Sequence, residues 1–158
     1  MKRYFVTVVK ISFVVYIAIL FIILFVRHRG NWWSDLSMFE YALMHMNLVP
    51  FKTILGYVQA IKDQTMNLNI PLENLFGNLF MFLPAGIYLP FFSDKIDSVK
   101  KLILGMLPIF LMIEVGQFLT KRGAFDIDDL ILNMLGAVIG YLIWNSRPVQ
   151  KLRIKLNL

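Results

Sequence analysis

The chain has 158 residues and a formal net charge of +6, and 58% of its residues are apolar while 16% are charged. Typical soluble domains are about 45–50% apolar and about 25% charged, so a water-soluble protein of this length could not bury so much apolar surface. This composition excludes a soluble enzyme, a secreted disulfide scaffold and a disordered tail. We therefore expect an all-α integral membrane protein with a single membrane domain over residues 1–158.

Residues that commonly bind soft metals or act as nucleophiles are scarce. Cysteine is absent, and the two histidines are His28 and His45. Disulfides, thiolate metal sites and a cysteine nucleophile are therefore excluded, and we predict no metal ion and no cofactor. The basic balance does not require a nucleic-acid partner, because Lys and Arg beside apolar segments usually set membrane topology and contact anionic lipid headgroups.

Four apolar stretches are long enough to cross a bilayer, for which a helix needs roughly 20 residues. They cover residues 5–26, 72–92, 102–119 and 127–144. The first begins like a signal peptide, but its apolar run is longer, and Arg27-His28-Arg29 stands where small residues would precede a cleavage site. We predict an uncleaved signal anchor and four transmembrane helices.

The distribution of basic residues predicts how the chain is oriented. With four spans, the N-terminus, the connection 93–101 and the tail 147–158 share one side of the membrane and carry ten of the 16 Lys and Arg, which leaves six on the other side. Cytoplasmic segments are enriched in Lys and Arg. We therefore expect both termini to be cytoplasmic, with the tail on the inner leaflet surface and segment 27–71 outside the plasma membrane.

The outer segment 27–71 is too long to be a structureless linker in a compact protein. Ser37 and Glu40 have the spacing of a capping box, which predicts a short helix over 38–45. The following stretch 47–51 is predicted to be extended, because a residue that precedes proline avoids the helical region.

A second interfacial helix is predicted over residues 53–65. Its apolar residues recur at helical spacing, opposite a polar face, and they are Ile54, Leu55, Val58 and Ile61. Such a helix is too short to span and lies in the plane of the membrane interface. Trp32 and Trp33 are also suited to the membrane–water boundary, where an indole ring has one apolar and one hydrated side.

Polar side chains within the spans are the most informative residues, because burying an amide or a carboxylate in hydrocarbon costs several kcal/mol unless the group is paired. They gather at one depth, in the outer third of the bilayer. The set comprises Asn74, Asn78, Glu114, Gln117, Arg122, Asp126, Asp128, Asp129 and Asn133. We expect these side chains to form an outward-facing pocket that binds or shields a headgroup, a cell-wall precursor or an antibiotic group.

Structural roles for the same residues remain open. Asp126 can cap the fourth span, and Glu114 can form an ion pair with Arg122. The asparagines can join helices through hydrogen bonds, and Gly136 with Gly140 forms a close-packing face. In this alternative the chain is a structural or partner membrane protein whose polar cluster only holds its own helices together.

Catalysis is a further alternative. The candidates for a general base or a metal ligand are Glu114, Asp126, Asp128 and Asp129. They would act on a lipid-linked or surface-anchored substrate, but no nucleophile motif or glycine-rich phosphate loop accompanies them. Their oxygens would also suit a divalent cation, although consecutive helical positions point about 100° apart.

Four sequence blocks within residues 45–145 resemble the VanZ-like family of teicoplanin-resistance proteins and their relatives. The blocks are N-L-V-P-F-K-T-I from Asn47, N-L-F-G-N from Asn74 with F-L-P-A-G from Phe82, E-V-G-Q from Glu114, and R-G-A-F-D-I-D-D-L-I-L-N from Arg122. The last block is specific, and the others follow in the family's order.

The resemblance implies a plasma-membrane protein of a Gram-positive bacterium. It also implies low-level resistance to teicoplanin-type lipoglycopeptides, which act on the cell envelope, without a change in the peptidoglycan stem terminus. The expected partners are the lipid bilayer and either a lipid-linked cell-wall precursor or the lipoglycopeptide antibiotic. The resemblance carries no cofactor and no reaction.

Overall fold

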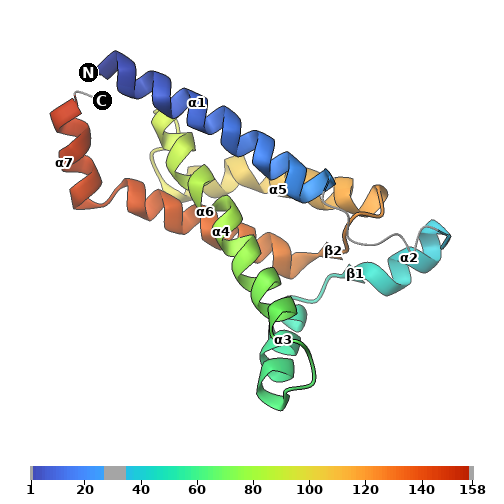
Figure 1. Cartoon of the computed structure of the whole chain (residues 1–158). Helices are drawn as coiled ribbons and strands as arrows, with labels where there is room; N and C mark the ends of the chain where they lie inside the picture. Colours follow the sequence, from blue (N-terminus) through green and yellow to red (C-terminus); the bar gives the residue numbers. More distant parts are fainter. Residues whose placement is uncertain (1, 27–34, 157–158) are drawn as a thin grey trace.

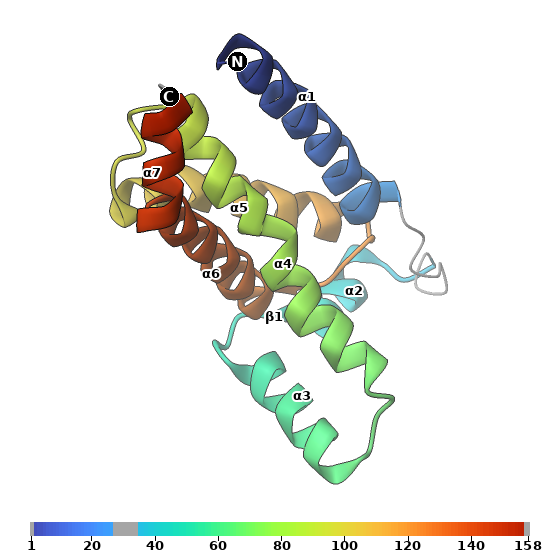
Figure 2. The ribbon, with the colours of Figure 1, turned by 60° about the vertical axis from the view of Figure 1, so that its left-hand side comes forward.

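The computed structural model describes residues 2–26 and 35–156 and is mostly helical (Figures 1 and 2). Four helical stretches are long and apolar enough to cross a membrane, as predicted. They are α1 (Lys2–Phe21) with its π-helical continuation η1 (Ile22–Val26), α4 (Asn69–Phe92), α5 (Val99–Leu119) and α6 (Ile127–Trp144). Their apolar side chains face outward over much of their length, so this is a membrane protein in contact with lipid.

The remaining elements are short. They are α2 (Met38–His45), β1 (Met46–Asn47), α3 (Lys52–Asp63), β2 (Phe125–Asp126) and α7 (Arg147–Leu156). Helices α2 and α3 correspond to the two predicted interfacial helices. Trp32 and Trp33, which we assigned to the membrane boundary, lie outside the described residues.

Helices α4 and α6 form the tightest contact in the molecule because glycines let their backbones approach. Gly136 and Gly140 lie directly against backbone carbonyls of α4, and Gly86 lies against the carbonyl of Ala137, so that a Cβ at any of the three would overlap the opposing backbone. The predicted close-packing face is therefore confirmed, and its partner lies within the same chain. The contribution of Gly86 was not predicted.

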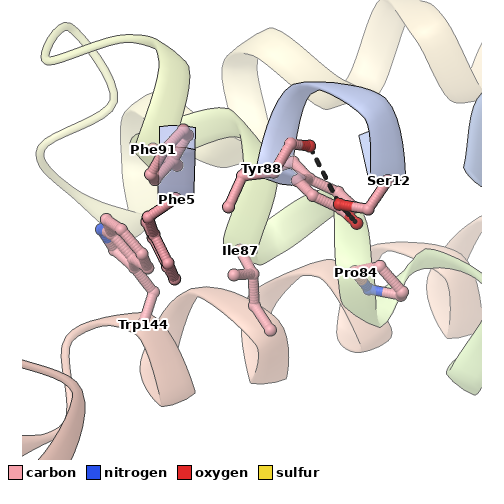
Figure 3. A pocket seen from close by; sticks show the side chains of 8 residues that line it. Phe5, Ser12, Pro84, Ile87, Tyr88, Phe91 and Trp144 are labelled. Carbon is pink, nitrogen blue, oxygen red and sulfur yellow. Dashed lines mark hydrogen bonds between the residues drawn. The ribbon is translucent and has the colours of Figure 1, made fainter. Parts of the chain in front are cut away.

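The other two long helices pack onto this pair. On α5, Phe110 is fully buried and its ring meets Phe82 edge to face, with 4.7 Å between centroids. Helix α1 contacts α4 through hydrogen bonds, one of which joins the Tyr88 and Ser12 hydroxyls at 3.0 Å beside an aromatic groove (Figure 3). The Tyr16 hydroxyl donates to the Met81 carbonyl at 3.0 Å.

A two-residue parallel ladder connects the outer segment to α6. Strand β1 pairs with β2, with Met46 opposite Phe125 and Asn47 opposite Asp126. Helix α2, which precedes β1, begins with the predicted capping box and is held by Tyr41, whose hydroxyl donates to the Gly123 carbonyl at 3.0 Å. The pairing fixes the middle of the outer segment, between α2 and α3, at the start of α6.

Helices α3 and α7 are amphipathic. Helix α3 lies beside the N-terminal half of α4 (Figure 2), and it leaves Leu55 and Val58 exposed where a membrane interface could receive them. Helix α7, which we did not predict within the basic tail, places the Arg153 guanidinium 4.2 Å from the centre of the Trp144 ring. Cation–π contacts of this kind fasten a terminal helix to the bundle.

Candidate functional site

One end of the bundle encloses a polar cavity of about 190 Å³. The end of η1, the first half of α4, the last turns of α5 and the first turns of α6 meet there. Of the nine predicted polar residues, seven line this cavity, and they are Asn74, Asn78, Glu114, Gln117, Asp126, Asp129 and Asn133. Arg122 and Asp128 are not among its lining residues.

Asp128 instead caps another helix. It is fully buried on the first turn of α6, and its carboxylate accepts three backbone hydrogen bonds, at 2.5, 2.8 and 3.1 Å, from Phe51, Thr53 and Ile54. These N–H groups open α3, which has no cap from its own chain segment, and Phe51 has a left-handed φ of 66°. A carboxylate satisfies such orphan donors and suits the positive end of the helix dipole.

Asp126 completes this connection. Its side chain accepts from the backbone N–H of Asp128 at 2.9 Å and so caps α6, as predicted. It also accepts from the Asn47 amide at 2.9 Å and from the Thr53 hydroxyl at 2.6 Å. We call the hydrogen-bonded set of Asn47, Thr53, Asp126 and Asp128 the latch, because it fastens β1 and α3 to the start of α6.

Glu114 lies between the latch and the cavity. It is 2% exposed, and its carboxylate accepts the backbone N–H of Asp126 at 3.2 Å. The ion pair that we considered for Glu114 and Arg122 does not form, because the Arg122 guanidinium donates to the Phe25 carbonyl instead. The Gln117 amide similarly donates to the Leu24 carbonyl at 3.2 Å, so both side chains bind the carbonyl end of η1.

The lining contains two buried acceptor atoms that have no hydrogen-bond partner in the described part of the chain. Asn133 is 3% exposed, and its Oδ1 has no hydrogen-bond partner; the Oδ1 of Asn74 also has none. An unsatisfied buried acceptor costs about 1–3 kcal/mol. Asp129 accepts from the Asn78 amide at 2.6 Å across the α4–α6 contact. The cavity therefore offers hydrogen-bond acceptors to whatever occupies it.

The acidic residues diverge in space. Asp128 points toward α3, whereas its neighbour Asp129 faces the cavity. Within residues 2–26 and 35–156, no three His, Cys, Asp or Glu side chains are grouped so that they could hold a metal ion. The oxygens of Asp126 and Asp128 are engaged by amide and hydroxyl donors.

Sequence reasoning did not single out several lining residues. Thr53 and Tyr57 reach the cavity from α3, and Ile23, Leu24 and Met81 complete its wall. Thr53 and Tyr57 belong to the predicted interfacial helix over 53–65, whose position at the outer face is the signal that could have found them. The apolar lining residues carry no such signal, because apolar residues occupy both the lipid-facing and the inward-facing positions of a membrane span.

The chain matches known proteins over the region that builds this site. Residues 13–148 match the VanZ/LLP1 protein family. The chain is 30% identical over 122 residues to protein VanZ of Enterococcus faecium, a match that covers 75% of this chain and 66% of that relative. The matched part thus spans just under two thirds of the relative's length. No solved structure matches the chain. The family match extends from the first long helix to the end of the fourth, and on this evidence the chain belongs to the VanZ/LLP1 family of membrane proteins.

Proposed function

We propose that this protein is a membrane binding protein whose polar cavity binds or shields a headgroup, a cell-wall precursor group or an antibiotic group at the outer leaflet. The observation that carries the proposal is the cavity itself, where polar side chains from three long helices converge around the unsatisfied Oδ1 of Asn133. Buried acceptors of this kind are expensive in a membrane unless a ligand uses them. The family resemblance supports a role in low-level resistance to teicoplanin-type lipoglycopeptides.

The orientation of the chain belongs to this proposal. The basic residues of α7 and of the connection between α4 and α5 lie at the end of the bundle opposite the cavity. By the positive-inside rule, that end is cytoplasmic and the cavity opens toward the outer leaflet of the plasma membrane. Cysteine labelling at Asp94 and at Gln64, with a reagent that does not cross the membrane, tests this: Gln64→Cys should react in intact cells and Asp94→Cys should not.

Antibiotic susceptibility tests the role of the cavity. Glu114→Gln and Asp129→Asn each replace a carboxyl group of the lining by an amide with little change in side-chain volume. Expressed in a glycopeptide-susceptible Gram-positive host, the unaltered chain should raise the inhibitory concentration of teicoplanin, and both variants should lose this protection at equal membrane abundance. Glu73→Gln, at an exposed carboxylate of α4, is the matched control. Unchanged protection by both cavity variants would exclude these carboxylates from the mechanism.

Binding and catalysis are separable by product analysis. An enzyme that used Glu114 or Asp129 as a general base would generate or consume a membrane lipid or wall precursor. Mass spectrometry of extracts from cells with and without the chain should show the same species if the chain only binds. A species that depends on both the chain and its cavity carboxylates would replace the binding proposal with an enzymatic one.

A further inference from the structure

The lining of the polar cavity is rich in acceptors, and several of its donor groups are already engaged within the chain. The Asn78 amide already donates to Asp129, the Gln117 amide to the Leu24 carbonyl, and the Thr53 hydroxyl to Asp126. The unsatisfied groups are the Oδ1 atoms of Asn74 and Asn133. No Lys, Arg or His is among the described residues that line it.

This chemistry selects against an anion. Three carboxyl side chains, those of Glu114, Asp126 and Asp129, line the same small space, and no Lys, Arg or His stands beside them among the described lining residues. A phosphate or carboxylate would meet repulsion and would find acceptors where it needs donors, whereas a protonated primary amine has three N–H donors and a positive charge. The complementary ligand is therefore an ammonium group.

The size of the cavity limits how much of a ligand can enter. Its volume of about 190 Å³ is below the roughly 300–1,000 Å³ of pockets that hold drug-sized molecules. An ethanolamine-sized headgroup fits such a space. A whole glycopeptide does not, so a molecule of that size could present only one amine-bearing group to it.

An apolar groove of about 280 Å³ adjoins the cavity. It lies between α1, α4 and α5, and Tyr16, Leu20, Phe82 and Met106 are among its lining residues. The hydroxyl of Tyr16 is engaged with the Met81 carbonyl, so the groove offers hydrocarbon. Leu24 of η1 lines both spaces, so the groove and the cavity meet at this residue, on the part of η1 that contacts α5.

Together the two spaces match an amphiphile. We propose that they hold a membrane lipid whose headgroup carries a primary ammonium, with the ammonium among the acceptors of the cavity and an acyl chain in the groove beside Leu24. This inference rests on the proposed function and names the ligand class of the same site. The aromatic groove of Figure 3 shares no lining residue with the polar cavity and is not part of it.

Lipid selectivity tests the headgroup half of this inference. The purified full chain is mixed in detergent with equal amounts of phosphatidylethanolamine, phosphatidylcholine and phosphatidylglycerol of identical acyl chains, and retained lipid is measured by mass spectrometry of the intact protein. Phosphatidylethanolamine should be retained about tenfold over the other two, because choline has no N–H donor and glycerol has no charge. Glu114→Gln and Asp129→Asn should abolish the preference, and Glu73→Gln should keep it. Equal retention, or a preference for phosphatidylglycerol, would overturn the inference.

Filling the groove tests the acyl half. Ile109 lines the groove from α5 and is 40% exposed, so that Ile109→Trp places a ring in the groove at a position where the fold tolerates it. This variant should retain about tenfold less phosphatidylethanolamine, whereas Leu104→Trp, on an exposed position of α5 outside the groove, should not. Glycerophosphoethanolamine, the headgroup without chains, should not displace the bound lipid at equal concentration. Displacement by it, or no effect of Ile109→Trp, would overturn the role of the groove.

The two proposals fail in different ways. If the cavity variants lose antibiotic protection but the chain shows no preference for an amine-bearing lipid, the binding function stands and the ammonium assignment falls. If the variants lose lipid selectivity but keep protection, the ammonium site stands and the resistance role of the cavity falls.

Discussion

The latch and the cavity both use residues of the first turns of α6, but they differ in whether their buried polar groups have hydrogen-bond partners. In the latch, Asp128 is fully buried and accepts three backbone hydrogen bonds. In the cavity, one turn beyond Asp129, Asn133 is almost as buried, but its Oδ1 has no partner. Burial removes water from the polar groups of both regions, and only in the latch do hydrogen bonds within the chain offset the free-energy cost of that desolvation. This difference distinguishes residues whose hydrogen bonds hold the site together from residues whose polar atoms are available to a ligand.

Removal of the central carboxylate of the latch should have the largest effect. Asp128→Ala leaves the first N–H groups of α3 buried without an acceptor, and hydrogen bonds to charged groups contribute roughly 1.5–3 kcal/mol each. We expect a loss of about 3 kcal/mol in the free energy of unfolding, measured by denaturation of the purified chain in mixed micelles. Asp94→Ala, at an exposed acid between α4 and α5, should change it by less than about 0.5 kcal/mol. Equal stability of the two variants would show that the latch does not hold α3.

A smaller loss of stability is expected when a hydrogen-bond partner of Asp126, the other acidic residue of the latch, is removed. Thr53→Val removes the hydroxyl that donates to Asp126 at 2.6 Å and preserves the branched shape. The same hydroxyl accepts from the Asn47 amide at 3.0 Å. We expect a loss of about 2 kcal/mol, most of it from the hydrogen bond to the charged acceptor. Thr53→Ser keeps the hydroxyl and should lose less than half as much in the same denaturation experiment. A larger loss for serine than for valine would mean that the methyl group of Thr53, and not its hydroxyl, stabilises this contact.

The contrast also explains what could be predicted from sequence. The four long helices could be predicted from the length of the apolar stretches. Because successive spans cross in opposite directions, the positions of the polar residues along the chain also predicted that they share one end of the bundle, and so most of the residues that line the cavity. The roles of Asp128 and Asp129 could not be predicted, because adjacent helical positions diverge and only the tertiary structure decides which faces α3. The β1–β2 pairing was missed because two-residue strands carry no periodicity, and the partner of Arg122 is a backbone carbonyl that no side-chain pattern reveals.

Replacing a polar residue of the cavity should raise the free energy of unfolding, whereas replacing one of the latch should lower it. Asn133→Leu replaces a buried amide whose Oδ1 is unsatisfied by an apolar side chain of similar size, and the adjacent cavity leaves room for it. We expect the free energy of unfolding to rise by about 1 kcal/mol, while antibiotic protection is lost. Asn145→Leu, at the far end of α6, removes a hydrogen bond to the Tyr141 carbonyl and should not stabilise the chain. Destabilisation by Asn133→Leu would indicate that this amide contributes to the fold, as the latch does.

The smallest effect is expected at the capping box of α2, which lies outside both regions but leads through β1 into the latch. Hydrogen bonds from the Ser37 side chain and backbone stabilise the ionised carboxylate of Glu40 and hold its pKa below the ordinary value. Their stabilising effect is therefore complete above the ordinary Glu pKa of about 4.3 and is lost as the pH falls through the lowered pKa. Amide exchange in α2, normalised to intrinsic rates, should accelerate on acidification relative to exchange in α7.

Ser37→Ala should bring part of this acceleration to neutral pH, with exchange in α2 faster by roughly fivefold, the effect of losing one N-cap. The amides of Thr53 and Ile54, which Asp128 holds from α6, should keep their protection, because their acceptor lies on a different helix from the capping box. If those two amides lose protection together with α2, the latch and the outer segment unfold as one cooperative unit. In that case the capping box of α2 would contribute to holding α3 against α6, although the two share no hydrogen bond.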